Sequence, residues 1–421
     1  MSDLLEIIEP QYFSGFKCIA SDCPDSCCIG WDVVIDEETY NKYKSCDIDI
    51  LKESFRNNIV RNENNIGISN YIPYAFVKLN NNACSFLTGE RLCFIQKNLS
   101  ESFLSQTCST YPRVINVVDS VLERYLCVSC PEAARLVLLN KDPIRLINAG
   151  YSEKNINNYR VNTLHTRGND KYLFFKESRQ FCIDLMQNRM FTVWQRLLVM
   201  GEFCLALDLI NHEDRMADIE CVIADFNKPF INDLLKKFDS YDSDHTSQLQ
   251  AVKILLDYSL NDRFISDRYR EYVNKFEQGL YLTGDYLFQN SVVEYKNAYF
   301  KYYSPLMIEH DYVFENYIVN HMLKEIFPHV SHSNGLTANY SIYDKYILLV
   351  LQVAMTKSLL IGISGYYNEK FSIEHVVNVI QVFTKNISHN QIYLHQALEF
   401  IKAAKMDNIE GVMTLIKNTC L

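Results

Sequence analysis

Residues 18–31, which read CIASDCPDSCCIGW, place four cysteines close together near the start of the chain. Of the 14 cysteines, ten lie between Cys18 and Cys130, and all ten histidines come later, the first being His165. Soft thiolates bind iron and zinc, and rigid backbone must hold each ligand at a defined distance. The clustering therefore predicts a thiolate-ligated metal site in the first 130 residues, rather than cysteines that only fill a core.

Around this stretch, turn signals and short apolar runs predict a mixed α/β region over residues 1–140. Thr88-Gly89-Glu90 predicts a hairpin turn flanked by Cys84 and Cys93, with 92–95 as a strand. Asp119-Ser120 predicts a second hairpin that joins 114–118 to 121–128. Asp36 is expected to cap a short helix that ends near residue 43. Pro131 suits the first turn of a helix, which places Cys130 at its N-cap.

The remainder, residues 141–421, is predicted to be helical because chain breakers are scarce and aromatic residues are abundant. The whole chain has 13 Gly and 9 Pro but 28 Tyr and 24 Phe. A further division near 239–247 follows from a polar linker there, and 163–170 is a second polar linker. The fold class is therefore mostly α, with a small mixed cysteine-rich metal domain ahead of a multi-helix domain. Apolar periodicity predicts helices at 248–259, 317–327, 343–361, 372–383, 391–405 and 407–417, the last with Asp407 in its capping box.

Charge and hydropathy exclude several partner classes. The net charge of −10 opposes binding to phosphate backbones, so we expect no nucleic acid partner. Residues 346–367 form the one long apolar run, and Gln352, Lys357 and Ser358 interrupt it, so it is predicted to be a buried helix and no membrane partner is expected. Residues 1–10 lack a basic leader and an apolar core. The expected location is the cytoplasm, where thiols stay reduced.

The cysteine spacing does not decide between iron and zinc. Only Cys127 and Cys130 have the Cys-x-x-Cys spacing of a zinc knuckle, and the common ferredoxin run is absent. Cys23 and Cys27 have the first spacing of the radical S-adenosylmethionine signature, but Gly30 stands where its third cysteine would be. Gly-x-Gly and Walker A motifs are also absent. The isolated Cys46, Cys182, Cys204, Cys221 and Cys420 are expected to have structural roles.

Residues 18–31 resemble the N-terminal signature of the flagellin lysine N-methylases, within a wider group of iron- or zinc-chelating cysteine clusters. Further matching segments are 84–87 (CSFL), 92–93 (LC), 108–113 (CSTYPR), 123–124 (ER) and 129–135 (SCPEAAR). The similarity is dense over residues 10–140. Beyond residue 140 it extends only to length and helical character.

The resemblance implies methyl transfer from S-adenosylmethionine to lysines of flagellin by an enzyme that depends on a [4Fe-4S] cluster. The cysteines that match the family's signature are the implied metal ligands, with zinc as the alternative metal, whereas Cys127 fits it less well. These ligands are Cys18, Cys23, Cys27, Cys28, Cys84, Cys93, Cys108 and Cys130. Arg113, Glu123 and Arg124 either bind polar groups of a cofactor or form structural ion pairs, and Trp31 either anchors its loop or stacks on a ligand.

Two other functions remain open at this point: an iron–sulfur electron-transfer protein and a structural zinc module that docks on a partner. For methyl transfer the chemical requirement is definite. A lysine amine has a reference pKa of about 10.4 and must lose its proton before it can attack a methyl group. The residue that accepts this proton is not evident from the sequence.

Overall fold

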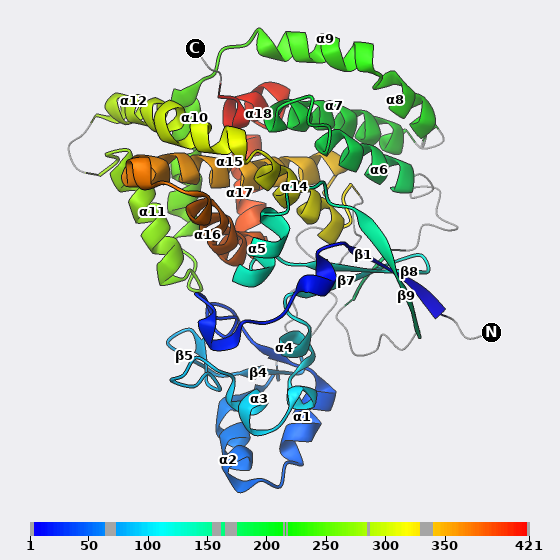
Figure 1. Cartoon of the computed structure of the whole chain (residues 1–421), viewed down its shortest axis with the longest axis vertical. Coiled ribbons are helices and arrows are strands. Elements are labelled where there is room, and N and C mark those ends of the chain that lie inside the picture. The colour runs from blue at the N-terminus through cyan, green and yellow to red at the C-terminus, as the bar shows by residue number, and fades with distance from the viewer. Residues whose placement is uncertain are drawn as a thin grey trace.

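The computed structural model describes residues 4–63, 73–153, 161–164, 175–213, 215, 218–283, 287–328 and 340–418. Figure 1 shows a large helical body, a twisted sheet against one side of it, and a small lobe below. The predicted fold class, mostly α with a small mixed N-terminal part, is confirmed. Only Thr163 and Leu164 of the linker predicted at 163–170 belong to the described residues.

The larger sheet has five strands in the order β10-β7-β8-β1-β9. β7 (Arg113–Val118) and β8 (Val121–Leu126) form the predicted hairpin, with Asp119 in the turn at φ 57°. β1 (Leu4–Pro10) pairs with β8 in parallel and with β9 (Leu146–Glu153) in antiparallel orientation, while β10 (Val161–Leu164) lies parallel to β7. Strands from beyond residue 140 therefore complete this sheet, and the expectation of helices directly after residue 140 was wrong.

The small lobe has its own hydrophobic core, formed mainly by residues between Val33 and Ile95. Tyr43 stacks on Phe55 with ring centroids 4.1 Å apart, and Asp36 caps the first helix by accepting from Thr39 N at 2.8 Å, as predicted. The lobe contains β2 (Val34–Ile35), β3 (Ile59–Arg61), β4 (Ala75–Val77), β5 (Leu79–Asn80), β6 (Ala83–Cys84), α1 (Glu37–Lys44), α2 (Asp49–Asn58), α3 (Phe94–Asn98) and α4 (Gln106–Thr110).

The strand predicted at 92–95 is instead the start of α3, so the hairpin between Cys84 and Cys93 is only partly formed. Leu87 and Cys93 make a single bridge, after which Cys93 becomes the N-cap of α3. Thr88 closes the tight turn by accepting from Leu92 N at 3.2 Å through its hydroxyl. The two segments therefore pair at the Leu87–Cys93 bridge alone, and the chain continues into α3 at Phe94.

In the helical body, α15 (Ile342–Tyr367) is the central helix (Figure 1). Its length and hydropathy would suit a membrane span, but 89% of its apolar window is buried inside the protein. Gly279 at the end of α11 lets that helix approach α15 closely, since a Cβ there would lie 2.0 Å from Gly362 O. The other helices are α5 (Pro131–Leu138), α6 (Phe175–Met186), α7 (Val193–His212), α8 (Ile219–Asp225), α9 (Lys228–Asp239), α10 (His245–Ser259), α11 (Asp267–Gly279), α12 (Phe288–Ala298), α13 (Ser304–Glu309), α14 (Tyr312–Lys324), α16 (Ile373–Phe383), α17 (Gln391–Ala403) and α18 (Ile409–Ile416).

Several helix starts differ from prediction: α10 begins at His245, three residues before the predicted start, and the starts of α15 and α16 differ by one residue. α14 begins at Tyr312, five positions before the predicted start, because its first turn buries Val313 and Phe314 in the core. α18 is capped by Asn408, which accepts from Gly411 N at 2.9 Å, rather than by Asp407. The polar linker predicted near residue 240 does separate α9 from α10.

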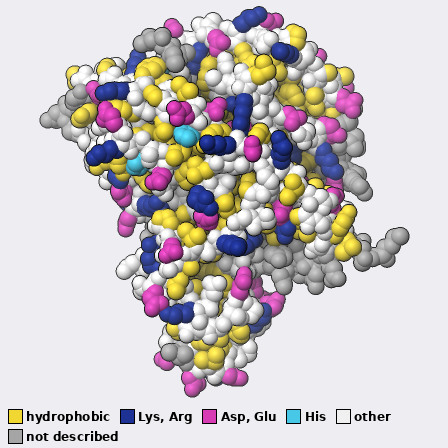
Figure 2. All heavy atoms as spheres, in the orientation of Figure 1, with side chains coloured by type: hydrophobic (Ala, Val, Ile, Leu, Met, Phe, Trp, Pro, Cys, Tyr) yellow, Lys and Arg dark blue, Asp and Glu magenta, His cyan; other side chains and the backbone are white. Residues whose placement is uncertain are grey.

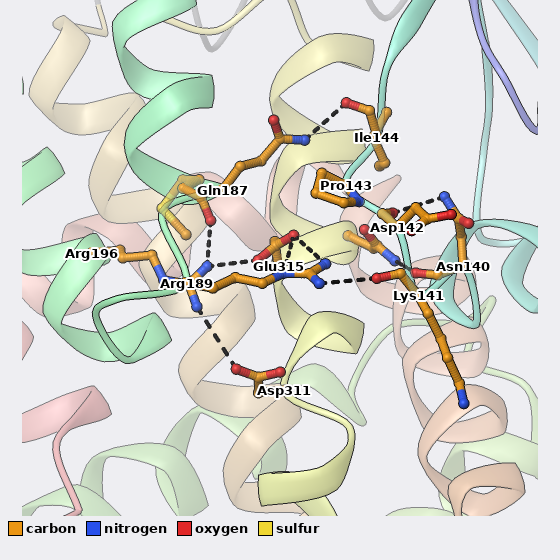
Figure 3. Close-up of polar contacts among 12 residues, drawn as sticks. Asn140, Lys141, Asp142, Pro143, Ile144, Gln187, Arg189, Arg196, Asp311 and Glu315 are labelled. Atoms are coloured by element: carbon orange, nitrogen blue, oxygen red, sulfur yellow. Dashed lines mark hydrogen bonds and ion pairs between the residues drawn. The ribbon is translucent and has the colours of Figure 1, made fainter.

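A buried ion cluster fastens α14 to α7 and to the segment that follows α5 (Figure 3). Glu315 on α14 accepts from Arg196 Nη1 at 2.8 Å and from Arg189 Nη2 at 2.8 Å. Arg196 and Glu315 are both fully buried. Arg189 also donates to Lys141 O at 3.0 Å, so the cluster connects three separate parts of the chain.

Replacing Glu315 with leucine is expected to lower the free energy of unfolding by about 3–5 kcal/mol, because Arg196 would remain buried without its carboxylate. Urea denaturation measures this. The control is Asp233→Leu, which removes the acidic partner of Lys236 in an exposed pair and should cost about 1 kcal/mol or less. Equal losses in both variants would contradict the role assigned to Glu315.

Candidate functional site

Short backbone contacts place the 18–31 loop against the small lobe. Cys84 N donates to Cys28 O at 2.7 Å, and Gly30 N donates to Asn82 O at 2.9 Å. Gly30 has a φ of +91°, a conformation that side-chain-bearing residues rarely adopt. The turn at Gly30 therefore brings Cys27 and Cys28 next to Cys84, which lies far away in the sequence.

Five cysteines gather where this loop meets the lobe, and we call them the inner thiol group: Cys27, Cys28, Cys84, Cys93 and Cys108. The thiol of Cys27 donates to Cys28, and Cys28 in turn donates to Cys84. Cys93 at the start of α3 and Cys108 in α4 lie close enough to interact electrostatically with Cys27. Cys84 is buried whereas Cys27 and Cys108 reach the surface, so the group opens to solvent on one side.

The remaining predicted ligands, Cys18, Cys23 and Cys130, lie near Cys27 or near one another. Cys23 interacts electrostatically with Cys18 and Cys27, and Cys130 with Cys23 and Cys27. Cys130 is the N-cap of α5 with Pro131 in the first turn, as predicted. All eight predicted ligands thus occupy one region of the molecule.

The donor chemistry of the inner thiol group suits an iron–sulfur cluster, which is held by cysteine thiolates. Although part of Cys108 reaches the surface, desolvation by the surrounding protein raises the pKa of its thiol to about 12. The hydrogen bond from Cys27 lowers the pKa of Cys28, but donation to Cys84 together with burial raises it to about 12. Among the described residues no three His, Cys, Asp or Glu side chains converge on one point as a single metal ion requires. The structure therefore shows a gathering of suitable donors and not a formed coordination sphere.

A buried ion pair joins the 18–31 loop to the helical body. Lys385 donates to Asp25 Oδ1 at 2.7 Å and to Ser26 O at 2.9 Å. Burial tends to raise the pKa of Asp25, but Lys385 lowers it to a net value below the ordinary one. Gln381 donates to Ser129 O at 2.6 Å and to Asp25 Oδ2 at 3.1 Å, so one residue of α16 holds both cysteine-bearing loops.

Beside the Asp25–Lys385 ion pair, Trp31 lies between Tyr111 and His389. Its ring centroid is 5.3 Å from that of Tyr111 and 5.9 Å from that of His389, both edge to face. The indole N–H donates to Cys27 O at 2.8 Å, and the Lys385 ammonium lies 5.5 Å from the ring centroid. Trp31 thus anchors its loop, and its stacking on a ligand remains a prediction.

Sequence reasoning missed a thiol–imidazole contact at the same place. The Nε2 atom of His389 lies 3.4 Å from Cys127 Sγ, and Ser129 donates to that sulfur at 3.1 Å. Burial tends to raise the pKa of Cys127, but His389, Lys324 and Ser129 together lower it to about 6. No local pattern signals a pair that is separated by 262 positions.

The charged residues predicted to bind a cofactor have protein partners. Glu123 is buried and pairs with Arg179 at 2.8 Å, and Arg124 pairs with Glu9 at 2.5 Å. Arg113 is exposed, with its guanidinium 5.1 Å from the ring centroid of Phe16. Glu123 and Arg124 therefore form structural ion pairs, which was one of the two interpretations, and a role of these residues or of Arg113 in cofactor binding stays a prediction.

An open hollow of about 600 Å³ on α6 and α8 contains none of the predicted site residues. It is lined by Lys176, Glu177, Gln180, Phe181, Asp184, Glu220 and Ile223.

Comparison with known proteins identifies the helical body. The family described as FliB lysine N-methylase C-terminal domain matches residues 179–415, which run from within α6 to the next-to-last residue of α18. This chain belongs to the lysine N-methylase family. No solved structure matches it.

The individual relatives are consistent with this family assignment. The flagellar biosynthetic protein FliU of Salmonella muenchen is 31% identical over 142 residues, which are 34% of this chain and 82% of the relative. Two proteins named lysine-N-methylase, from Salmonella typhimurium strain LT2 and Salmonella choleraesuis strain SC-B67, are each 30% identical over 159 residues. Each of these two alignments covers 38% of this chain and 38% of the relative.

Replacing Lys385 with methionine should loosen the loop that carries Cys23, Cys27 and Cys28, because Asp25 would lose the ammonium group that it pairs with in the helical body. Amide hydrogen exchange of residues 20–31 is expected to accelerate about tenfold or more. Lys236→Met, on the exposed face of α9, should leave this exchange unchanged. Exchange at the wild-type rate in Lys385→Met would show that the pair does not hold the loop.

Proposed function

We propose that this protein is a protein-lysine N-methyltransferase that acts on flagellin with S-adenosylmethionine as methyl donor. The observation that carries the proposal is the family match over residues 179–415, the part of the chain against which the cysteine-bearing loops are held. The names of the relatives, lysine-N-methylase and flagellar biosynthetic protein, support the reaction and the flagellar substrate.

The inner thiol group is our proposed set of ligands for a [4Fe-4S] cluster, which needs four of its five sulfurs. S-adenosylmethionine, when bound, would supply an electrophilic methyl group on a sulfonium sulfur. What the chain itself must do is bind the substrate lysine, remove its proton and exclude water from the amine. We place these three steps near Trp31, because the thiol-bearing loops and the helical domain of the family meet there.

Surface charge agrees with a protein substrate that presents lysine. The net charge is −10, which favours approach of a cationic side chain. On the face shown in Figure 2, basic and acidic side chains are interspersed across the described residues, which is not the broad basic surface of a nucleic acid-binding protein. The 13 cysteines within the described residues are all free, in keeping with the cytoplasmic location that we propose.

Flagellin co-expressed with this chain should gain mass in steps of one methylene on lysine residues, because each transferred methyl replaces a hydrogen on the amine. Mass spectrometry of flagellin peptides measures the gain. Flagellin expressed alone is the control. Unmodified lysines in the presence of well-expressed, folded protein would exclude flagellin as the substrate.

Replacing Cys93 and Cys108 together with serine is expected to lower the iron content of anaerobically purified protein, because only three of the five sulfurs of the inner thiol group would remain. Cys221→Ser is the control, since Cys221 is exposed, as Cys108 is, but lies on α8. Iron and zinc are counted per chain, with about four irons expected for one cluster. Colourless wild-type protein that carries only zinc would contradict the iron assignment.

A further inference from the structure

Lys345 on α15 is a cation without a counter-charge beside it. The residue is half-buried, and among the described residues its ammonium forms no hydrogen bond and no ion pair. The neighbouring carboxylate of Asp344 pairs with Lys402 at 2.7 Å instead. Desolvation lowers the pKa of Lys345, and Glu325 opposes this only in part. A cation set into protein in this way is stabilised when an anion binds next to it.

The carboxylate of Glu325, at the end of α14, lies within electrostatic range of Lys345 and has one oxygen to spare. Its Oε1 accepts from the Lys324 ammonium, and among the described residues nothing donates to Oε2. Desolvation tends to raise the pKa of Glu325, but chiefly the Lys324 ammonium outweighs this, and the pKa lies below its ordinary value. The side chain is 45% exposed, so Oε2 can accept from a ligand.

A free cation near a half-used carboxylate selects the kind of ligand. An α-amino acid carries a carboxylate and an ammonium on the same carbon, and these two groups complement Lys345 and Glu325 in turn. A phosphate would place its negative charge close to the Glu325 carboxylate and be repelled. His321, the other ionisable group at this end of α14, is neutral at physiological pH because desolvation lowers its pKa to about 4.

The end of α14 is held in place by side chains from two other elements. Asn116 on β7 donates to Leu323 O at 3.3 Å and to Lys324 O at 3.1 Å. Arg179 on α6 also donates to Leu323 O, at 3.3 Å. The turn that carries Glu325 is therefore fixed before a ligand arrives, which lowers the entropic cost of binding.

This part of α14 lies beside the Cys127–His389 contact. Lys324 interacts electrostatically with Cys127. Asn320, one turn earlier on the same helix, donates to Leu126 O at 3.0 Å, so α14 packs against the strand that leads into Cys127. A ligand bound at the end of α14 is therefore close to the place where we put methyl transfer.

We propose that Lys345 and Glu325 bind the α-amino acid end of S-adenosylmethionine, with Lys345 pairing with its carboxylate and Glu325 with its α-ammonium. This inference rests on the proposed function, which names this methyl donor. Both residues lie within the matched range 179–415, and neither the family match nor the names of the relatives assign them a role.

Lys345→Met is expected to raise the Kd of S-adenosylmethionine by about 10-fold or more, the usual effect of removing one partner of a charge-assisted hydrogen bond. Decarboxylated S-adenosylmethionine, which lacks only the carboxylate, should bind this variant and the wild-type protein equally well. Calorimetric titration of the full chain without flagellin measures both ligands. Lys345→Arg should keep most of the affinity, and Lys236→Met, in an exposed pair on α9, should change neither Kd.

Glu325→Gln tests the other half of the site. Both ligands keep the α-ammonium, so this variant should weaken both, whereas Lys345→Met weakens only the complete donor. Because the substitution leaves Lys324 without a carboxylate, a thermal unfolding curve establishes that the variant is folded. The Lys345→Met measurement does not depend on it, since that variant removes a side chain that has no partner among the described residues.

Unchanged affinity of Lys345→Met for S-adenosylmethionine, or an equal loss for both ligands, would overturn the assignment of Lys345. If the wild-type protein binds neither ligand, the methyl donor of the proposed function fails and this site fails with it. The expected pattern of affinities together with unmethylated flagellin would instead support the donor site and refute the substrate, so the two failures are distinguished.

Discussion

The buried pairing of Lys385 with Asp25 is the constraint on which the arrangement of the site depends. A charge removed from water is tolerated only when a partner compensates it, so these two side chains can be buried only together. Asp25 sits between Cys23 and Cys27 in the chain, and Lys385 sits in the π-helical turn that precedes His389. One interaction therefore fixes the position of the thiol-bearing loop relative to the helical domain.

The site has two chemically distinct parts, the inner thiol group and the Cys127–His389 pair, and Trp31 lies between them. Trp31 hydrogen-bonds to the backbone of Cys27, which belongs to the inner thiol group, and packs edge to face against His389, which contacts Cys127. The inner thiol group has only sulfur donors and suits a metal cluster. The Cys127–His389 pair instead combines one sulfur and one imidazole.

Local features of the fold were predictable because their causes are local. Pro131 after Cys130 marks a helix start, and Asp119-Ser120 closes a hairpin, since each depends on a few adjacent residues. The prediction of a strand at 92–95 was wrong, because Cys93 makes only one bridge, to Leu87, and is then the N-cap of a helix. Completion of the sheet by strands beyond residue 140 depends on long-range pairing, which no local pattern encodes.

The candidate site was predictable only in part, for the same physical reason. Clustered thiols are visible in the sequence because metal ligation needs many of one residue type. Glu123 looked equally suited to a cofactor or to an ion pair, and only the packing of Arg179 against it revealed the ion pair. His389 is one histidine in a helix-rich region, and only the folded chain brings it to Cys127.

In our proposal, the thiol-bearing loops and the helical domain form one reaction site. The most direct test is calorimetric titration of S-adenosylmethionine into anaerobic protein loaded with the proposed cluster and into the same protein after the cluster has been removed. Our account predicts tighter binding to the cluster-loaded protein, because both parts contribute to the methyl-donor site. Equal affinity in the two forms, together with methyl transfer by the cluster-free protein, would contradict it and reduce the thiol group to a structural role.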